Sequence, residues 1–434
     1  MSGNGRLVGA GLVVALVAAG CSTSTPTLPA LVTPTAAATA VVTPAGPTVA
    51  ATPVSTPTQL VTAAPTGTPA AAHWTTSGEL LQSHASTHVV LVSGGKVLIV
   101  GDDNLFAPGP PSATEAELWD PATSKWTVTG GLNAPRDLFA AVSLKDGRAL
   151  ITGGVNDNYI SYSSTKLYDP SAGTFSQPGL MVYARTSPAW TVLADGRVMA
   201  ISGVYYNGVS NKVVTAVEIF DPVKGTWSGT GPLNVGRIGA QAVTLADGAV
   251  LVVGGTDINS TTLSSAELWD PVSGKWTVIG SLVQARDDFT LVALVDGSAL
   301  VAGGLNPSAV PETALASAER LDRGTGTWKA AAKMATAAAS RISATLANGR
   351  ILIAGGRVGA WKAAVNAAEI FDPAAGTWTA TVPMPMTLER SGAVLLSDGS
   401  VLVAGGDGGF VGPVSTPWYP DELLQSIRYF PAIP

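Results

Sequence analysis

The chain has 434 residues, of which 46% are hydrophobic and only 12% are charged, and it contains 49 glycines and 30 prolines. Length alone fits one large all-β unit as well as several domains, but this composition argues against long polar helices. The net charge of −6 and the absence of clustered Lys and Arg argue against a nucleic-acid partner, because phosphate binding needs grouped basic side chains. A single cysteine excludes an intrachain disulfide framework and a cysteine-rich metal site.

Residues 1–20 are typical of a secretory signal peptide. Arg6 precedes the apolar run Leu7–Ala19, which is too short to span a bilayer comfortably. The segment Val17–Cys21 resembles a bacterial lipobox, in which the cysteine becomes the lipidated N-terminus. We therefore predict a lipoprotein anchored through Cys21 to the extracytoplasmic face of a bacterial cell membrane, because two or more acyl chains anchor stably. An ordinary cleaved signal with an incidental cysteine is the alternative.

Residues 21–72 are predicted to form a disordered, lipidated stalk. After Cys21 the stretch consists mainly of Thr, Pro, Ala, Ser and Val and contains no charged residue. Such tracts favour extended, polyproline-like conformations and cannot bury a core. We expect the stalk to hold the following domain away from the membrane.

A unit of about 50 residues recurs seven times after the stalk. Each copy has a turn glycine before an apolar run, at Gly95, Gly147, Gly196, Gly248, Gly297, Gly349 and Gly399. In the fourth copy, Asp247-Gly248 predicts a tight hairpin turn before the apolar strand 249–253. Because this strand is apolar at every position, both faces of its sheet should be buried, as in the blades of a propeller.

Several short motifs recur in a constant order within these copies. The Asp-Gly turn and apolar strand are followed by Gly254-Gly255, Ala266–Pro271 and Gly274–Trp276. Together these motifs resemble the kelch repeat, as found in the propeller domain of the galactose oxidase family. The resemblance covers residues 74–434 and implies an all-β, seven-bladed propeller over residues 73–434, with four antiparallel strands in each blade.

Two offset series of apolar, mostly aromatic residues predict how the ring closes. The outer strands carry Trp74, Trp126, Phe175, Trp227, Trp276, Trp328 and Trp378. The third strands carry Trp119, Tyr168, Phe220, Trp269, Leu321, Phe371 and Tyr429. Since the first series begins before any turn glycine and no aromatic strand follows Tyr429, the N-terminal strand around Trp74 should complete the last blade and close the ring.

One basic residue in each copy lies about ten positions after the outer aromatic, with the last two expected slightly later because of longer loops. These candidate ligand-binding residues are His84, Arg136, Arg185, Arg237, Arg286, Arg341 and Arg390. The kelch resemblance implies that they lie at the entry to the innermost strand, on the face that carries the variable loops. They either form a basic ring around the mouth that binds carboxylate or phosphate, or pair with the third-strand glutamates and fix strand packing. Those glutamates are Glu117, Glu218, Glu267, Glu319 and Glu369.

Aromatic residues in the variable loops are further candidates for ligand contact. Tyr159, Tyr205, Trp361 and Trp418 would suit sugar rings or peptide side chains, or would cover the edge of a neighbouring blade. We predict a ligand on this loop face that is a glycan, an anionic peptide or a protein, and a monomeric propeller.

No catalytic residue, cofactor or metal site is predicted. In the galactose oxidase family, copper chemistry requires a tyrosine crosslinked to cysteine together with histidine ligands, whereas the histidines here are His73, His84 and His88 and the cysteine is Cys21. His84 and His88 alone would lack a third metal ligand. We therefore expect a non-catalytic binding module; the alternative is a carbohydrate-modifying enzyme of the epimerase or mutarotase type, since some kelch propellers isomerise sialic acid.

Overall fold

The computed structural model describes residues 71–82, 84, 88–101, 114–306, 312–359, 363–408 and 424–432. The predicted signal peptide, the lipidation site Cys21 and nearly all of the predicted stalk lie outside these ranges. Within them, no helix is long and apolar enough to cross a membrane. The one helix that they contain is the short 3-10 turn η1 (Ser93–Gly95).

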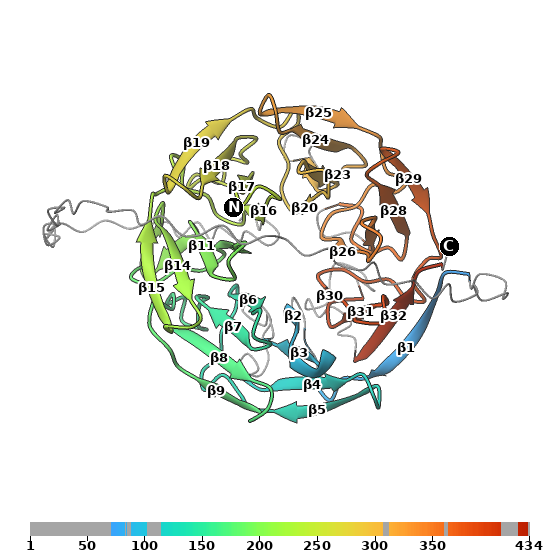
Figure 1. Ribbon diagram of the computed structural model, residues 1–434, viewed down its shortest axis with the longest axis horizontal. Helices are drawn as coiled ribbons and strands as arrows, with labels where there is room; N and C mark the ends of the chain where they lie inside the picture. Colours follow the sequence, from blue (N-terminus) through green and yellow to red (C-terminus); the bar gives the residue numbers. More distant parts are fainter. Residues whose placement is uncertain are drawn as a thin grey trace, which may run out of the picture. The chain divides into compact units, whose positions relative to one another are not determined.

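The described residues form seven four-stranded antiparallel sheets arranged as blades around a centre (Figure 1). Blades 1 and 2 contain β2 (His88–Leu91), β3 (Val97–Val100), β4 (Ala116–Asp120) and β5 (Lys125–Thr129), and then β6 (Ala140–Ser143), β7 (Ala149–Thr152), β8 (Thr165–Asp169) and β9 (Thr174–Ser176). Blades 3 and 4 contain β10 (Ala189–Val192), β11 (Val198–Ile201), β14 (Val217–Asp221) and β15 (Thr226–Thr230), and then β16 (Gln241–Thr244), β17 (Val250–Val253), β18 (Ala266–Asp270) and β19 (Lys275–Ile279).

The remaining blades repeat this order and lead to the ring closure. Blades 5 and 6 contain β20 (Thr290–Ala293), β21 (Ala299–Ala302), β24 (Ala318–Asp322) and β25 (Thr327–Ala331), and then β26 (Ile342–Thr345), β27 (Ile351–Ala354), β28 (Ala368–Asp372) and β29 (Thr377–Ala380). Blade 7 contains β30 (Gly392–Leu395), β31 (Val401–Ala404), β32 (Gln425–Phe430) and β1 (His73–Glu79). Two small hairpins extend loops between second and third strands: β12 (Val204–Tyr206) with β13 (Asn211–Val213), and β22 (Leu305–Asn306) with β23 (Thr313–Ala314).

The hydrophobic core lies between neighbouring blades. One cluster joins Met199 and Ile201 of β11 to Val250 and Val252 of β17. All four residues of β17 are buried, because alternate side chains of a strand point to opposite faces and a blade covers each face. The continuous apolar runs predicted from the sequence are therefore the second strands of the blades.

Glycines allow the close turns at both ends of these second strands. Gly248 has φ +83° in the hairpin that leads into β17. Gly255 has φ +79° just after β17, and a Cβ there would lie 2.7 Å from the carbonyl oxygen of Ile238. The second glycine of the pair thus lets the loop pack directly against the backbone that enters the innermost strand of its own blade.

The ring closes as predicted, by pairing of the first strand with the last. Trp74 of β1 pairs with Tyr429 of β32, and their ring centroids are 4.9 Å apart. Trp126 Nε1 of blade 1 donates to Ser426 Oγ at 3.0 Å, and that hydroxyl lies 2.8 Å from the carbonyl oxygen of Ser77. Trp119 Nε1 of blade 1 also donates to the carbonyl oxygen of Ser77 at 2.9 Å, so β1, which lies beside β32 in Figure 1, is bonded both to its own blade and to blade 1.

Candidate functional site

The predicted basic position lies where each chain segment enters an innermost strand. The next residue forms a bridge with the residue after the Gly-Gly pair of the same blade, as in Asp137↔Val155 and Asp287↔Leu305. The carbonyl oxygen of the basic residue itself accepts from the preceding blade; Gly154 N donates to Arg185 O at 2.9 Å. This position therefore lies on the loop face and links neighbouring blades.

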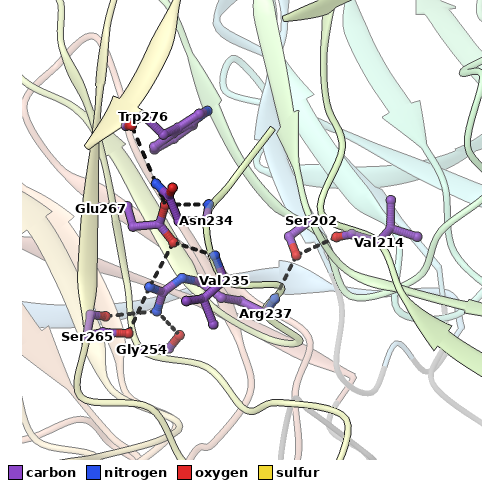
Figure 2. A network of polar contacts seen from close by, with 9 residues as sticks. All are labelled: Ser202, Val214, Asn234, Val235, Arg237, Gly254, Ser265, Glu267 and Trp276. Atoms are coloured by element: carbon purple, nitrogen blue, oxygen red, sulfur yellow. Dashed lines mark hydrogen bonds and ion pairs between the residues drawn. The ribbon is translucent and has the colours of Figure 1, made fainter. Parts of the chain in front are cut away.

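The side chain of Arg237 points into its own blade (Figure 2). Its Nη1 donates to the carbonyl oxygens of Gly254 at 3.0 Å and Ser265 at 2.8 Å, and its Nη2 donates to Ser265 Oγ at 2.9 Å. Nη2 also pairs with Glu267 Oε1 at 3.2 Å, and both side chains are fully buried. Burial lowers the pKa of Arg237, whereas the charge of Glu267 acts in the opposite direction and favours the cation.

Glu267 connects this arginine to the loop that enters the blade. Its carboxylate accepts from the backbone N–H groups of Asn234 at 2.8 Å and Val235 at 3.1 Å, and from Asn234 Nδ2 at 2.9 Å (Figure 2). Arg237 N in turn donates to Ser202 Oγ of the preceding blade at 2.7 Å. The pair therefore fastens the second strand, the third strand and the incoming loop together.

The same pairing recurs in other blades. The pairs are His84–Glu117 at 3.2 Å, Arg185–Glu218, Arg286–Glu319 at 2.7 Å and Arg341–Glu369 at 3.6 Å. These side chains are nearly or completely buried, so the structure places them in the packing arrangement rather than in an accessible basic ring. Ligand binding by these residues stays an untested prediction, and their burial gives it no support.

Blades 2 and 7 depart from the pairing in different ways. In blade 2 the glutamate position is taken by Lys166, and Arg136 instead stacks on Tyr162 with its guanidinium carbon 4.7 Å from the ring centroid. Burial lowers the pKa of Arg136 to about 10. In blade 7 both positions are apolar, Leu388 and Ile427, and both side chains belong to one core cluster.

The expectation that Arg341 and Arg390 come later because of longer loops is wrong. Gly304 N donates to Ala338 O at 3.1 Å and Gly356 N donates to Leu388 O at 2.7 Å, so Ala338 and Leu388 occupy the repeated position. Arg341 reaches its glutamate from three residues further along the chain. Arg390 instead lies 3.8 Å from Asp407 Oδ2, with its side chain 30% exposed.

A second group of charged residues lies on the loop face of blades 5, 6 and 7. We call Asp287, Asp288, Glu312, Arg357 and Glu389 the mouth cluster. Arg357 Nη1 donates to Glu389 Oε2 at 2.9 Å, and Arg357 Nη2 donates to Asp288 Oδ2. Arg357 of blade 6 thus bridges carboxylates from the blades on either side.

Asp287 differs from the other carboxylates of the mouth cluster. It is only 6% exposed, and its Oδ1 atom is buried without a hydrogen-bond partner among the described residues. Burial raises the pKa of Asp287 to about 7, with the charges of Asp288 and Glu312 acting in the same direction and Arg357 opposing them. A carboxyl group that titrates near neutrality is suited to binding or to proton transfer.

Strained backbone accompanies the cluster. Asp288 has φ +53° and Ser340 has φ +52°, a region that non-glycine residues rarely adopt. Ser340 N donates to Asp288 O at 3.0 Å, and Ser340 Oγ donates to Asp288 Oδ2 at 2.5 Å. The equivalent residues of blades 2 and 3 repeat the backbone bond, from Ser187 N to Leu138 O at 2.8 Å. Leu138 with φ +51° and Ser187 with φ +48° share this conformation, so it belongs to the repeat and holds the innermost turns together.

The mouth cluster is not among the sites predicted from the sequence. One feature of the sequence could have indicated it: two aspartates directly follow Arg286, and Glu389 and Arg390 directly follow Leu388. That these residues meet Arg357 depends on the angular order of the blades, which a repeat pattern does not express.

The predicted aromatic residues lie elsewhere on the loop face. Tyr159, with φ +56°, and Tyr205, which is 38% exposed, belong to loops of blades 2 and 3. Gly208 N donates to Tyr159 O at 2.9 Å, so these two loops are in contact. Trp361 and Trp418 lie outside the described residues.

Comparison with known proteins identifies the repeat. The family model for the kelch motif matches residues 240–283 and 338–385. Galactose oxidase of Gibberella zeae is 31% identical over 143 residues, which cover 31% of this chain and 19% of that oxidase. An F-box/kelch-repeat protein of Arabidopsis thaliana is 26% identical over 145 residues, covering 32% of this chain and 39% of that protein. The matches thus span well under half of the relatives' lengths.

Solved structures show the same fold. A fungal alcohol oxidase of the AA5 family, in complex with copper, superposes with a TM-score of 0.63 at 17% identity, covering 83% of this chain and 77% of the oxidase. The structure of YjhT gives a TM-score of 0.54 at 16% identity and covers 70% of this chain and 99% of that protein.

The histidines described here do not fit a copper site. His73 stacks on Phe430, His84 Nδ1 donates to the carbonyl oxygen of Gly101 while its Nε2 lies 3.2 Å from Glu117 Oε1, and burial lowers the pKa of His88 to about 4. The described ranges contain no group of three or more His, Cys, Asp or Glu side chains placed to hold a metal ion. We therefore derive no chemistry through copper. From its kelch motifs and its ring of seven four-stranded blades, the chain is a kelch-repeat β-propeller, part of which is similar in sequence to galactose oxidase.

Proposed function

We propose that this propeller is a non-catalytic binding module, anchored by a lipid on Cys21 to the extracytoplasmic face of a bacterial membrane. Its ligand is a glycan or a protein or peptide segment that docks on the loop face at the mouth cluster. The lipobox-like segment and the uncharged stalk support the anchoring. The mouth cluster supports the binding role.

The observation that carries the proposal is the gathering of ionic groups where blade packing does not require them. In blades 3 and 4 the residues that correspond to Asp287 are Thr186 and Ile238, and the same backbone bridges form. Burying charges is costly unless they are paired, and Asp287 is not fully paired. Since blades 3 and 4 pack without a charge at this position, the gathering of ionic groups in blades 5 to 7 is better explained by a ligand than by folding.

The structure changes which residues we place at the site. An anionic ligand held by the repeated arginines would require guanidinium groups that now lie within the blades. We therefore assign the ligand to the mouth cluster, not to the predicted basic ring.

Binding of the purified full chain to glycan and peptide arrays tests this assignment. We expect Arg357→Gln to abolish binding and Arg148→Gln to leave it unchanged, because Arg148 lies in the Asp-Gly turns of the opposite face, paired with Asp146. Thermal melting of each variant shows whether it folds, and Glu312→Gln gives a milder change at a half-buried position. Absence of any ligand on both arrays, or equal binding by folded Arg357→Gln, would refute the proposal.

The second candidate is a carbohydrate-modifying enzyme of the epimerase or mutarotase type. It is favoured by one observation, the pKa of Asp287 near 7, since a general acid or base works best when its pKa lies near the working pH. NMR spectra of hexoses and sialic acids incubated with the full chain would reveal anomeric or epimeric exchange. Exchange that Asp287→Asn abolishes would replace the binding role, and unchanged spectra over the panel would exclude this candidate.

A further inference from the structure

We propose that the mouth cluster recognises a protonated primary amine on its ligand, held by the Oδ1 atom of Asp287. This inference rests on the proposed function and specifies the chemistry that the same site reads. The group recognised here is a cation, whereas the arginine pattern predicted an anionic ligand.

The charge balance of the site favours a cation. The carboxylates of Asp287, Asp288 and Glu389 act on a single arginine, Arg357, and Glu312 acts electrostatically on Asp287. Both terminal nitrogens of Arg357 already donate to carboxylates, one to Asp288 and one to Glu389. The cluster therefore carries excess negative charge that no described side chain neutralises, and a ligand carboxylate would add to it.

The position of Asp287 shows where the cation would bind. Its side chain is more than nine-tenths buried and lies within the electrostatic reach of Asp288, Glu312 and Arg357. Its Oδ1 atom lacks the donor that buried carboxylates normally have among the described residues. An ammonium group supplies up to three donors and a full positive charge, so it satisfies this oxygen and removes the repulsion among the carboxylates.

The ionisation of Asp287 makes the binding depend on pH. Burial, Asp288 and Glu312 raise the pKa of Asp287 to about 7 and Arg357 lowers it, so the acid is largely protonated at pH 6 and largely ionised at pH 8. A protonated carboxyl group no longer attracts an ammonium ion. A lysine-type amine, with a pKa of about 10.4, stays charged over this interval, so its affinity should rise as the pH increases from 6 to 8.

Isothermal titration of the full chain with three related sugars tests the inference. We expect glucosamine at pH 7, where its amine is still mostly charged, to bind about tenfold or more tightly than glucose or glucuronate, because a charge-assisted hydrogen bond is worth about that factor. Affinity for Nα-acetyl-lysine amide, whose amine stays charged throughout, should fall several-fold from pH 8 to pH 6. Nα-acetyl-lysine amide in a fourth titration identifies the source of the amine: equal binding indicates a peptide side chain, and weaker binding indicates an amino sugar.

Matched variants separate amine binding from folding. Asp287→Asn should lower glucosamine affinity at pH 7 about tenfold and abolish the pH dependence of Nα-acetyl-lysine amide binding, and Glu312→Gln should lower glucosamine affinity about threefold. Asp137→Asn is the control, because Asp137 occupies the same bridge position in blade 2 and should leave the affinity unchanged. Thermal melting confirms that each variant is folded.

The outcomes also distinguish this inference from the proposed function. Equal or tighter binding of glucuronate, or glucosamine affinity unaffected by Asp287→Asn, would overturn the amine assignment. If the arrays then still reveal a ligand that depends on Arg357, the binding role stands without it. If the arrays reveal no ligand, the binding role itself fails.

Discussion

Replacing Arg237 by leucine should destabilise the propeller strongly, because it leaves the carboxylate of Glu267 buried without its cation. Glu267 would keep three N–H donors from Asn234 and Val235 but would lose the only opposite charge that contacts it in the described structure. Breaking one partner of a buried ion pair costs about 3–5 kcal/mol. Glu267→Ile should cost a similar amount, since Arg237 would keep its carbonyl acceptors but would remain charged in a dry site.

Blade 7 indicates what the double variant should do. There the corresponding residues are Leu388 and Ile427, which pack in one apolar cluster without any charge. Arg237→Leu combined with Glu267→Ile reproduces this pair, so its cost should be about 1–3 kcal/mol less than the sum of the two single changes. Urea unfolding followed by tryptophan fluorescence measures all three free energies.

An exposed pair provides the matched control. Arg197 pairs with Asp195 at 2.7 Å on the surface, with its side chain 42% exposed. Arg197→Leu should change the free energy of unfolding by no more than about 1 kcal/mol, because water already solvates both charges. The buried pairs do not fasten the blades if the two single variants are as stable as the parent. The same conclusion follows if the changes in free energy of unfolding of the Arg237 and Glu267 variants add exactly in the double variant.

Further perturbations test the seam, the exceptional blade and the titrating acid. Deleting residues 73–79 removes β1 from blade 7 and should lower the free energy of unfolding by about 3 kcal/mol or more, measured by thermal melting; an unchanged melt would contradict the closure. Lys166→Glu supplies the carboxylate that Arg136 lacks and should raise the free energy of unfolding in urea by about 1–3 kcal/mol. A lower free energy of unfolding would mean that the blade does not accept this ion pair. Asp287 binds a proton more tightly in the folded than in the unfolded state, so its contribution to stability is lost as pH rises from about 4 to 7. The free energy of unfolding of Asp287→Asn, taken relative to that of the parent, should therefore rise by roughly 2–4 kcal/mol between pH 4 and pH 8. A constant difference over this range would contradict the assigned pKa.

The repeat pattern was sufficient to predict the blades and their closure. Asp247-Gly248 and the apolar strand after it specify a hairpin from neighbouring residues alone, and the two aromatic series specify which strands end a blade. The pairing of Trp74 with Tyr429 could be predicted because each of the other third strands is followed by an outer strand of its own blade, which leaves only these two strands to pair. The mistake over Arg341 and Arg390 arose from following residue type; the constant ten-residue spacing leads to Ala338 and Leu388.

The candidate site was much less predictable. A repeat identifies equivalent positions, and it correctly placed Arg237 at the entry to an innermost strand, but it does not say whether a side chain turns into its blade or toward the mouth. That choice depends on Glu267 and on the carbonyl groups of Gly254 and Ser265, which offer buried acceptors on one side. Only the folded blade shows that these acceptors lie within reach.

The sequence by itself determined the local units and their number, because turns, apolar strands and strand ends are encoded within a few residues of one another. The tertiary structure alone decided which charges meet. Asp287, Arg357 and Glu389 lie in different blades, and they come together because the ring sets consecutive loops side by side. Burial at that junction then gives Asp287 its raised pKa, which depends on desolvation and on neighbours distant in the chain.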